Sequence, residues 1–198
     1  MKIRLFTSMA AVAAIAAMAV VPAAASAAPH WYKGTKQVVG TVVTKTGGNL
    51  TFTSPMATIK CKVSDTEEIW NPSTGGAGED LVTAFVISAC NVTVGSSACP
   101  KKGSTPVVAA NGLPWPSVLV AGTPIRDEIM KVRIRVACNA GAIPDEFEGT
   151  LLPAVGNGKL EFGGPGSGEL QDPFLNKMEV SGNDAIVAGP GKIKAKDP

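Results

Sequence analysis

The sequence predicts an all-β fold: a single-domain antiparallel β-sandwich, with an open or closed β-barrel as the alternative. Short runs of alternating apolar and polar residues recur along the chain, and helical periodicity is weak after the N-terminal segment. The chain has 198 residues, and its 22 glycines and 15 prolines fall mostly between these runs. About eight or nine short strands joined by such turns are typical of a sandwich or a barrel.

The N-terminus predicts a cleaved signal peptide over residues 1–27. Lys2 and Arg4 precede an apolar run over residues 9–21, and the motif Ala25-Ser26-Ala27 fits a cleavage site. The run is short for a membrane span, which needs ~20 apolar residues. We therefore expect a secreted, extracellular protein of bacterial type, monomeric, with no transmembrane segment after cleavage.

The mature chain is predicted to be electrically neutral. The precursor has 18 Lys and Arg and 16 Asp and Glu, and removal of Lys2 and Arg4 leaves 16 of each over 198 − 27 = 171 residues. A neutral chain gives no electrostatic reason to bind nucleic acid or anionic lipid. We expect a flexible segment over residues 28–37, then one all-β domain over residues 38–198 with a short C-terminal tail.

Several strands can be placed in order. Residues 38–54 read as two strands around a turn at Thr46-Gly47-Gly48-Asn49. Residues 57–63 alternate, so that Ile59, Cys61 and Val63 share one face. Residues 81–94 are apolar on both faces, which predicts a central strand covered on both sides.

A second hairpin is predicted over residues 130–153. Val132, Ile134, Val136 and Cys138 share one face of its first strand. Its outer face carries Arg133 and Arg135 opposite Glu146 and Glu148, a cross-strand ladder that contributes ~0.2–1 kcal/mol per pair. Further short strands follow in "NGKLEF", "NKMEVSG" and "AIVAGPGKIKA".

Four cysteines, Cys61, Cys90, Cys99 and Cys138, predict two disulfides in an exported chain. The favoured pairing is Cys90–Cys99 with Cys61–Cys138, and the alternative is Cys61–Cys90 with Cys99–Cys138. No C-x-x-C motif is present and His30 is the only histidine. The sequence therefore predicts no metal site, no cofactor and no histidine-based catalytic residue.

Paired carboxylates leave a carbohydrate-active enzyme as an alternative function. The candidates are Asp65, Glu67, Glu68, Glu79, Asp80, Asp127, Glu128, Asp145, Glu146 and Glu148. The acidic stretches "SDTEE" and "PDEFE" are interpreted as solvated turns. Because no motif assigns a reaction, the main prediction is a non-enzymatic protein with a binding or structural role.

Three residues are candidate ligand contacts. Trp115 stands between two prolines and Trp70 precedes a turn, and each could instead cover the core. Lys101 lies in the loop over residues 99–106, which suggests a protease inhibitor as a weaker alternative. The partner would be an extracellular glycan or protein.

The chain resembles small exported proteins of high-GC actinobacteria that have no assigned activity. The likeness lies in an Ala-rich signal, an "IKC" strand, an "ISAC" strand followed by "SSACP", and a later "VAC" strand. The resemblance implies export and a disulfide-braced β fold. It implies no activity and no site residue.

Overall fold

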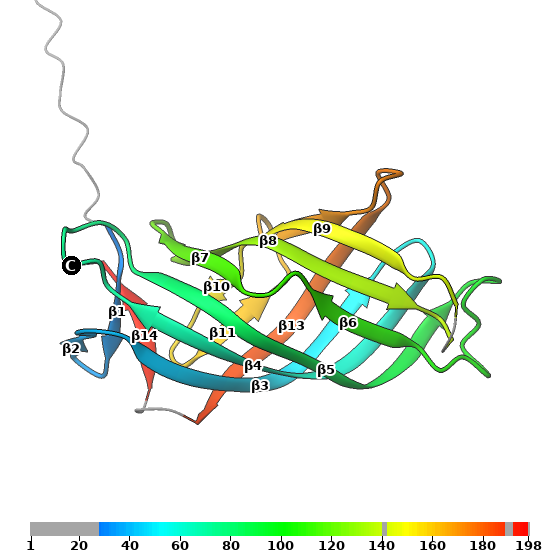
Figure 1. Cartoon of the computed structure of the whole chain (residues 1–198), viewed down its shortest axis with the longest axis horizontal. Coiled ribbons are helices and arrows are strands. Elements are labelled where there is room, and N and C mark those ends of the chain that lie inside the picture. Colours follow the sequence, from blue (N-terminus) through cyan, green and yellow to red (C-terminus); the bar gives the residue numbers. More distant parts are fainter. Residues whose placement is uncertain (1–27, 140–141, 189–191, 198) are drawn as a thin grey trace, which may run out of the picture.

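The protein is a closed β-barrel of eight strands with smaller strands added to its wall and to one end (Figure 1). The computed structural model describes residues 28–139, 142–188 and 192–197. Within these residues no helix is long and apolar enough to cross a membrane. The predicted signal peptide lies outside them. The strands are β1 (His30–Lys33), β2 (Lys36–Gln37), β3 (Val42–Thr53), β4 (Ala57–Trp70), β5 (Glu79–Gly95), β6 (Val107–Asn111), β7 (Trp115–Val120), β8 (Arg126–Ala137), β9 (Asp145–Leu151), β10 (Ala154–Val155), β11 (Lys159–Phe162), β12 (Gly168–Gln171), β13 (Lys177–Ala188) and β14 (Ile193–Lys196).

Pairing between β3 and β13 closes the barrel. The strands follow the order β13-β12-β9-β8-β7-β5-β4-β3, and β3 then pairs with β13 antiparallel from Thr53↔Glu179 to Lys45↔Ala188. A sandwich would leave two separate sheets with free edges, whereas this pairing removes the edge. The all-β prediction is confirmed, and the barrel alternative describes the architecture better than the sandwich.

The alternating strands of the barrel wall have the orientation that the sequence predicts. Ile59, Cys61 and Val63 of β4 are at most 5% exposed, and the lysines between them point outward. On β8 and β9, Arg133 lies 3.2 Å from Glu148 and Arg135 lies 3.6 Å from Glu146, side by side in register. Both the predicted core face and the predicted outer ladder are confirmed.

Two strand predictions are wrong. The residues predicted to turn at Thr46-Gly47-Gly48-Asn49 continue through β3, which bends back only after Thr53. A Cβ on Gly48 would collide with the backbone of Asn183, so this glycine permits close approach of β13 instead of a turn. On β5, Val86 is 58% exposed, so the strand is covered on one side only.

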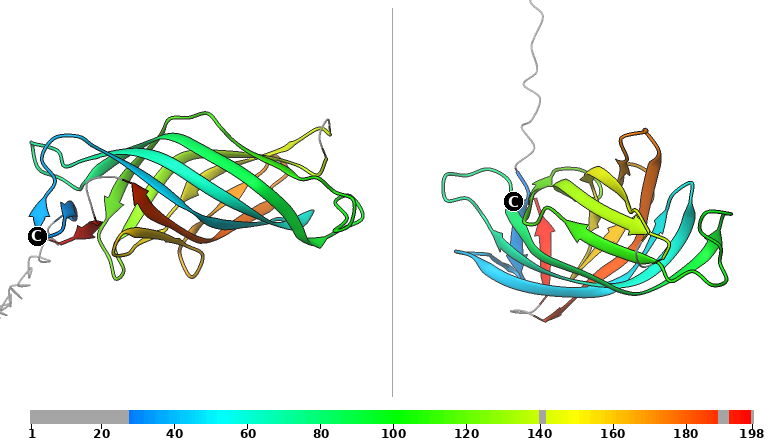
Figure 2. Two further views of the ribbon diagram at one scale, coloured as in Figure 1. Left: turned by 90° about the horizontal axis from the view of Figure 1, so that it is seen from below. Right: turned by 45° about the vertical axis from the view of Figure 1, so that its right-hand side comes forward.

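The two ends of the described chain form a cap over one end of the barrel. Strands β14, β1 and β2 make a three-stranded sheet, seen beside the C-terminus in Figure 2. Asn71 ties this sheet to the barrel: its Nδ2 donates to the carbonyls of Trp31 and Val38, and its Oδ1 accepts from the Trp31 amide. Residues 28–37 were expected to be flexible. Strands β1 and β2 lie within this segment, and Trp31 of β1 is 4% exposed.

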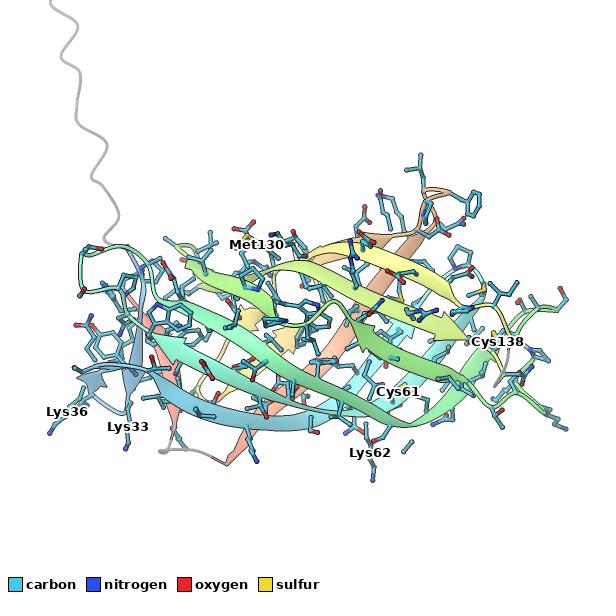
Figure 3. The ribbon with its side chains drawn as sticks, in the orientation of Figure 1. Lys33, Lys36, Cys61, Lys62, Met130 and Cys138 are labelled. Atoms are coloured by element: carbon cyan, nitrogen blue, oxygen red, sulfur yellow. A yellow bond between two sulfur atoms is a disulfide. The ribbon has the colours of Figure 1, made fainter. Side chains whose placement is uncertain are left out.

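The disulfides join Cys61 to Cys90 and Cys99 to Cys138, so the favoured pairing is wrong and the alternative is confirmed. Cys61 and Cys90 lie on neighbouring strands β4 and β5, where Lys60 pairs with Asn91. In Figure 3 the labelled cysteines lie far from Lys33 and Lys36 of the cap. Strand register decides which cysteines meet. Disulfides form in oxidising, non-cytoplasmic compartments.

Substitution of Gly182 by alanine is expected to destabilise the barrel by roughly 2–3 kcal/mol. Gly182 has a φ of +124°, and a Cβ there would collide with the Asn49 carbonyl across the β3–β13 seam. Gly34 also has a positive φ, +62°, but its Cβ would meet open space, so Gly34→Ala should cost only ~1 kcal/mol. Urea unfolding of the two variants measures the difference. Equal losses would contradict a role for close approach at the seam.

Candidate functional site: an acidic belt inside the barrel

The inward residues of β4 change from apolar to acidic and back to apolar along the barrel axis. Val63, Asp65, Glu67 and Ile69 alternate with outward residues, and all four are at most 6% exposed. Val63 belongs to the main apolar core, while Ile69 packs with Trp31, Val38, Leu119 and Ile193 under the cap. Two acids therefore lie between two apolar clusters.

Neighbouring strands supply polar side chains to the same layer. These polar side chains come from six strands that are consecutive around the barrel: β13, β3, β4, β5, β7 and β8. The members are Asp184, Thr44, Thr46, Asp65, Glu67, Asp80, Ser117 and Asp127, and all are at most 6% exposed. We refer to these eight residues as the acidic belt.

Hydroxyl groups and neighbouring carboxyl groups organise the belt. Thr46 Oγ1 donates to Asp65 Oδ1, and Ser117 Oγ donates to Asp127 Oδ1. Asp80 lies within hydrogen-bonding reach of Asp127. Glu67 lies within the same reach of Asp65. Two carboxyl groups this close cannot both be ionised at low cost, so each pair is suited to hold one proton between its members.

The belt contains no positive charge to balance its five carboxyl groups. The buried polar side chains of the described chain include no Lys, Arg or His. When no carboxyl proton is shared, several belt atoms also lack a hydrogen-bond partner within that part of the chain: Thr44 Oγ1, Glu67 Oε1, both Asp80 oxygens, Asp127 Oδ2 and both Asp184 oxygens. Because Thr46 has a single hydroxyl proton, which it gives to Asp65, it cannot also donate to Asp184. Buried polar groups without partners are rare in proteins and call for an occupant or a proton.

Burial raises the pKa of every belt acid. It raises the pKa of Asp127 to about 7, and burial together with the nearby charge of Asp65 raises the pKa of Asp184 to about 7. Burial and the charges of neighbouring belt acids hold the pKa of Glu67 and of Asp80 well above the ordinary range. Burial also raises the pKa of Asp65. These acids therefore keep their protons to a higher pH than exposed carboxyl groups do, and acquire charge as the pH rises.

A small cavity joins the belt to the cap. Its volume is about 20 Å³, and its walls include Thr44, Glu67 and Asp184 from the belt and Trp31 from the cap. Trp31 Nε1 is buried and has no hydrogen-bond partner within the described residues. The exposed Lys159, whose ammonium pairs with Glu161, also lines this cavity. A space of this size holds about one water molecule or one ammonium group.

The belt does not have the geometry of a metal site or of a glycosidase. Among the residues that the structure describes, no three Asp, Glu, His or Cys side chains converge as metal ligands. The two carboxyl groups of a glycosidase stand about 5–9.5 Å apart across an open cleft. Asp80 and Asp127 instead lie within hydrogen-bonding reach of each other and are each 1% exposed.

No protein-family model, curated protein or solved structure matches this chain. A groove of about 480 Å³ lies along the glycine-rich turn over residues 163–168. Its Glu169 is neutralised by Lys177, with Nζ 2.7 Å from Oε1, and its Glu179 is exposed. The uncompensated buried groups therefore make the belt, and not this groove, the candidate site.

None of the candidate contact residues of the sequence belongs to the belt, although Trp115 lines a small cavity together with Asp65. Trp115 is 2% exposed; it packs against Phe85 and donates from Nε1 to the Asn111 carbonyl, 2.9 Å away. It therefore covers the core and is not a surface contact. Trp70 is half-buried at the end of β4. Lys101 is exposed in its loop, and its inhibitory role stays a prediction.

The sequence contained a signal for the belt that the interpretation of "SDTEE" as a solvated turn missed. The period-two pattern of Ile59, Cys61 and Val63 continues unbroken through Asp65 and Glu67, so both acids fall on the inward face. Asp80 and Asp127 were candidates only for glycoside hydrolysis, and Asp184 was not a candidate at all. Asp80 and Asp127 converge because β7 pairs with both β5 and β8, and barrel closure adds Asp184 by placing β13 beside β3.

Proposed function

We propose that the protein is a secreted, non-enzymatic binding protein whose acidic belt holds the ammonium group of a small organic amine. The observation that carries this proposal is the set of five buried carboxyl groups with no buried cation beside them in the described chain. Burial of uncompensated carboxylates is costly, and a bound cation removes that cost.

A primary ammonium group fits the belt better than a metal ion does. Ammonium donates three separate hydrogen bonds, so its acceptors need not form a tight coordination shell. Acceptors without partners line the cavity on Thr44, Glu67 and Asp184. The cavity admits one group of about the size of water. An amine could therefore place its charged end here, with its remainder directed toward the exposed side near Lys159.

Thermal unfolding and calorimetry at pH 8 test the proposal with ammonium, methylamine and putrescine. Tetramethylammonium is the matched ligand control, because it carries the same charge but has no N–H donor. We expect the amines to raise the unfolding midpoint at pH 8, above the pKa of about 7 of Asp127 and Asp184, and to lose most of this effect at pH 5. Calcium and magnesium are expected to have no such effect.

Asp184→Asn and Glu67→Gln keep the shape of the belt, and each removes one ionisable carboxyl group. Loss of one charged hydrogen bond corresponds to ~1.5–3 kcal/mol, or roughly 10–100-fold in affinity for the amine. Glu179→Gln is the matched control, because Glu179 is exposed on the same strand as Asp184. The proposal is wrong if tetramethylammonium acts as strongly as methylamine, or if folded Asp184→Asn retains full affinity.

A further inference from the structure

Large apolar side chains are exposed at the end of the barrel opposite the cap. The turn over residues 172–176 between β12 and β13 presents Phe174 and Leu175, which are 83% and 75% exposed. Ile143, in the connection from β8 to β9, is 95% exposed. Thr53, the last residue of β3, pairs with Glu179 near the start of β13, so the turn before β13 lies at the end of the barrel where β3 turns into β4. The connection from β8 to β9 lies at the same end, because β9 pairs with both β8 and β12. We refer to this end as the loop end.

Hydrogen bonds hold the tip over residues 172–176 in one conformation. Asp172 Oδ1 accepts from the amides of Phe174 and Asn176, and Oδ2 accepts from the Asn176 side chain, at 2.8–2.9 Å. Burial alone would raise the pKa of Asp172, but the hydrogen bonds from Asn176 and Phe174 outweigh it and lower the pKa. Leu175 has a φ of +64°, a conformation unfavourable for leucine, which these bonds maintain. A rigid tip loses little entropy when its side chains are buried by a partner.

The charges at the loop end are positive although the mature chain is neutral. The described turns over residues 54–56, 96–106, 142–144 and 172–176 contain Lys101, Lys102 and Asp172 as their only charged residues. Asp172 is buried and satisfied by its own turn, whereas both lysines are exposed. The Cys99–Cys138 disulfide anchors the lysine loop beside the end of β8.

We propose that the loop end docks on an anionic lipid surface, with Phe174 and Leu175 inserted among the lipid chains and Lys101 and Lys102 facing the headgroups. The turns project from the barrel separately (Figure 1), and such high exposure means that these side chains stand clear of the wall instead of lining a groove. A fluid bilayer accepts separate apolar side chains at any spacing, whereas a protein partner needs a matching pocket for each one. Apolar insertion combined with nearby lysines is the usual basis of reversible binding to anionic membranes.

Vesicle co-sedimentation of the full chain tests this proposal. Phosphatidylcholine vesicles containing phosphatidylglycerol are expected to bind the protein, and pure phosphatidylcholine vesicles to bind it more weakly. Phe174→Ser combined with Leu175→Ser should weaken binding to the mixed vesicles at least about tenfold. Lys101→Gln with Lys102→Gln should remove the preference for phosphatidylglycerol and the salt dependence.

Val39→Ser is the matched control, because Val39 is 92% exposed but lies beside the cap at the opposite end. This variant should bind vesicles as the unmodified protein does. The proposal is overturned if neither kind of vesicle binds the protein, or if Val39→Ser and the Phe174/Leu175 variant lose binding equally. It is also overturned if sedimentation velocity shows that the apolar tip forms a dimer and that vesicles do not bind.

Discussion

Raising the pH from 5 to 8 is expected to destabilise the folded protein by several kcal/mol. The acidic belt causes this effect, because burial raises the pKa of its carboxyl groups and the unfolded chain restores ordinary values. A group whose pKa is higher in the folded state binds its proton more tightly there. The stability that it contributes is complete below the unfolded pKa and is lost as the pH rises through the folded pKa.

Asp127 and Asp184 determine the pH window, since their folded pKa values are about 7. Between pH 5 and pH 8, the contribution of each such carboxyl group to the free energy of unfolding falls by roughly 2–3 kcal/mol, for a pKa near 4 in the unfolded chain. For a chain of this length each loss corresponds to a fall of roughly 5–10 °C in the unfolding midpoint. Asp172, whose pKa is lowered, contributes its stability fully above pH 5 and therefore does not oppose the trend.

Asp184→Asn separates the belt from other sources of pH dependence. Asparagine cannot ionise, so the variant should be more stable than the unmodified protein at pH 8 by about 2 kcal/mol, with a shallower dependence on pH. Glu179→Gln, on the outside of the same strand, should leave the profile unchanged. Urea unfolding at intervals between pH 5 and pH 8 gives these values. A flat profile for the unmodified protein, or stability that increases with pH, would contradict charge burial in the belt.

Removal of either disulfide is expected to cost about 4 kcal/mol. The disulfides span sequence separations of 29 and 39 residues and close two successive loops that do not overlap. Each therefore restricts a different part of the unfolded chain. We expect Cys61→Ala with Cys90→Ala, and Cys99→Ala with Cys138→Ala, to lose similar amounts, measured by guanidinium unfolding. The two losses should add nearly completely in the fourfold variant.

The single variant Cys61→Ala tests the pairing directly. It should contain one free thiol, at Cys90, and keep Cys99 joined to Cys138, as thiol labelling and peptide mapping without reduction would show. A free thiol at Cys138 in this variant would instead support the pairing of Cys61 with Cys138. The Cys61→Ala variant should lose about as much stability as the Cys61/Cys90 double variant. The two losses should differ only by the cost of burying a free thiol.

Side-chain periodicity predicted the wall of the barrel, because a strand alternates its faces whatever its neighbours are. The inward face of β4 and the ladder of Arg133 and Arg135 against Glu146 and Glu148 follow from that rule alone. The same rule failed at Gly47-Gly48. Glycine has no side chain, so a glycine pair does not show which face of a strand points inward. The same pair is compatible with a turn and with a close approach between strands.

The sequence by itself determined the all-β class, the number of disulfides and the orientation of the alternating strands. Only the tertiary structure decided that the sheet closes between β3 and β13, which cysteines pair, and that both ends of the described chain form a cap. The acidic belt was likewise decided only by the tertiary structure. Its members come from six strands, and no local pattern records which strands become neighbours. Strand pairing is a long-range property of the chain, and it brought Asp184 beside Thr46 and the acids of β4.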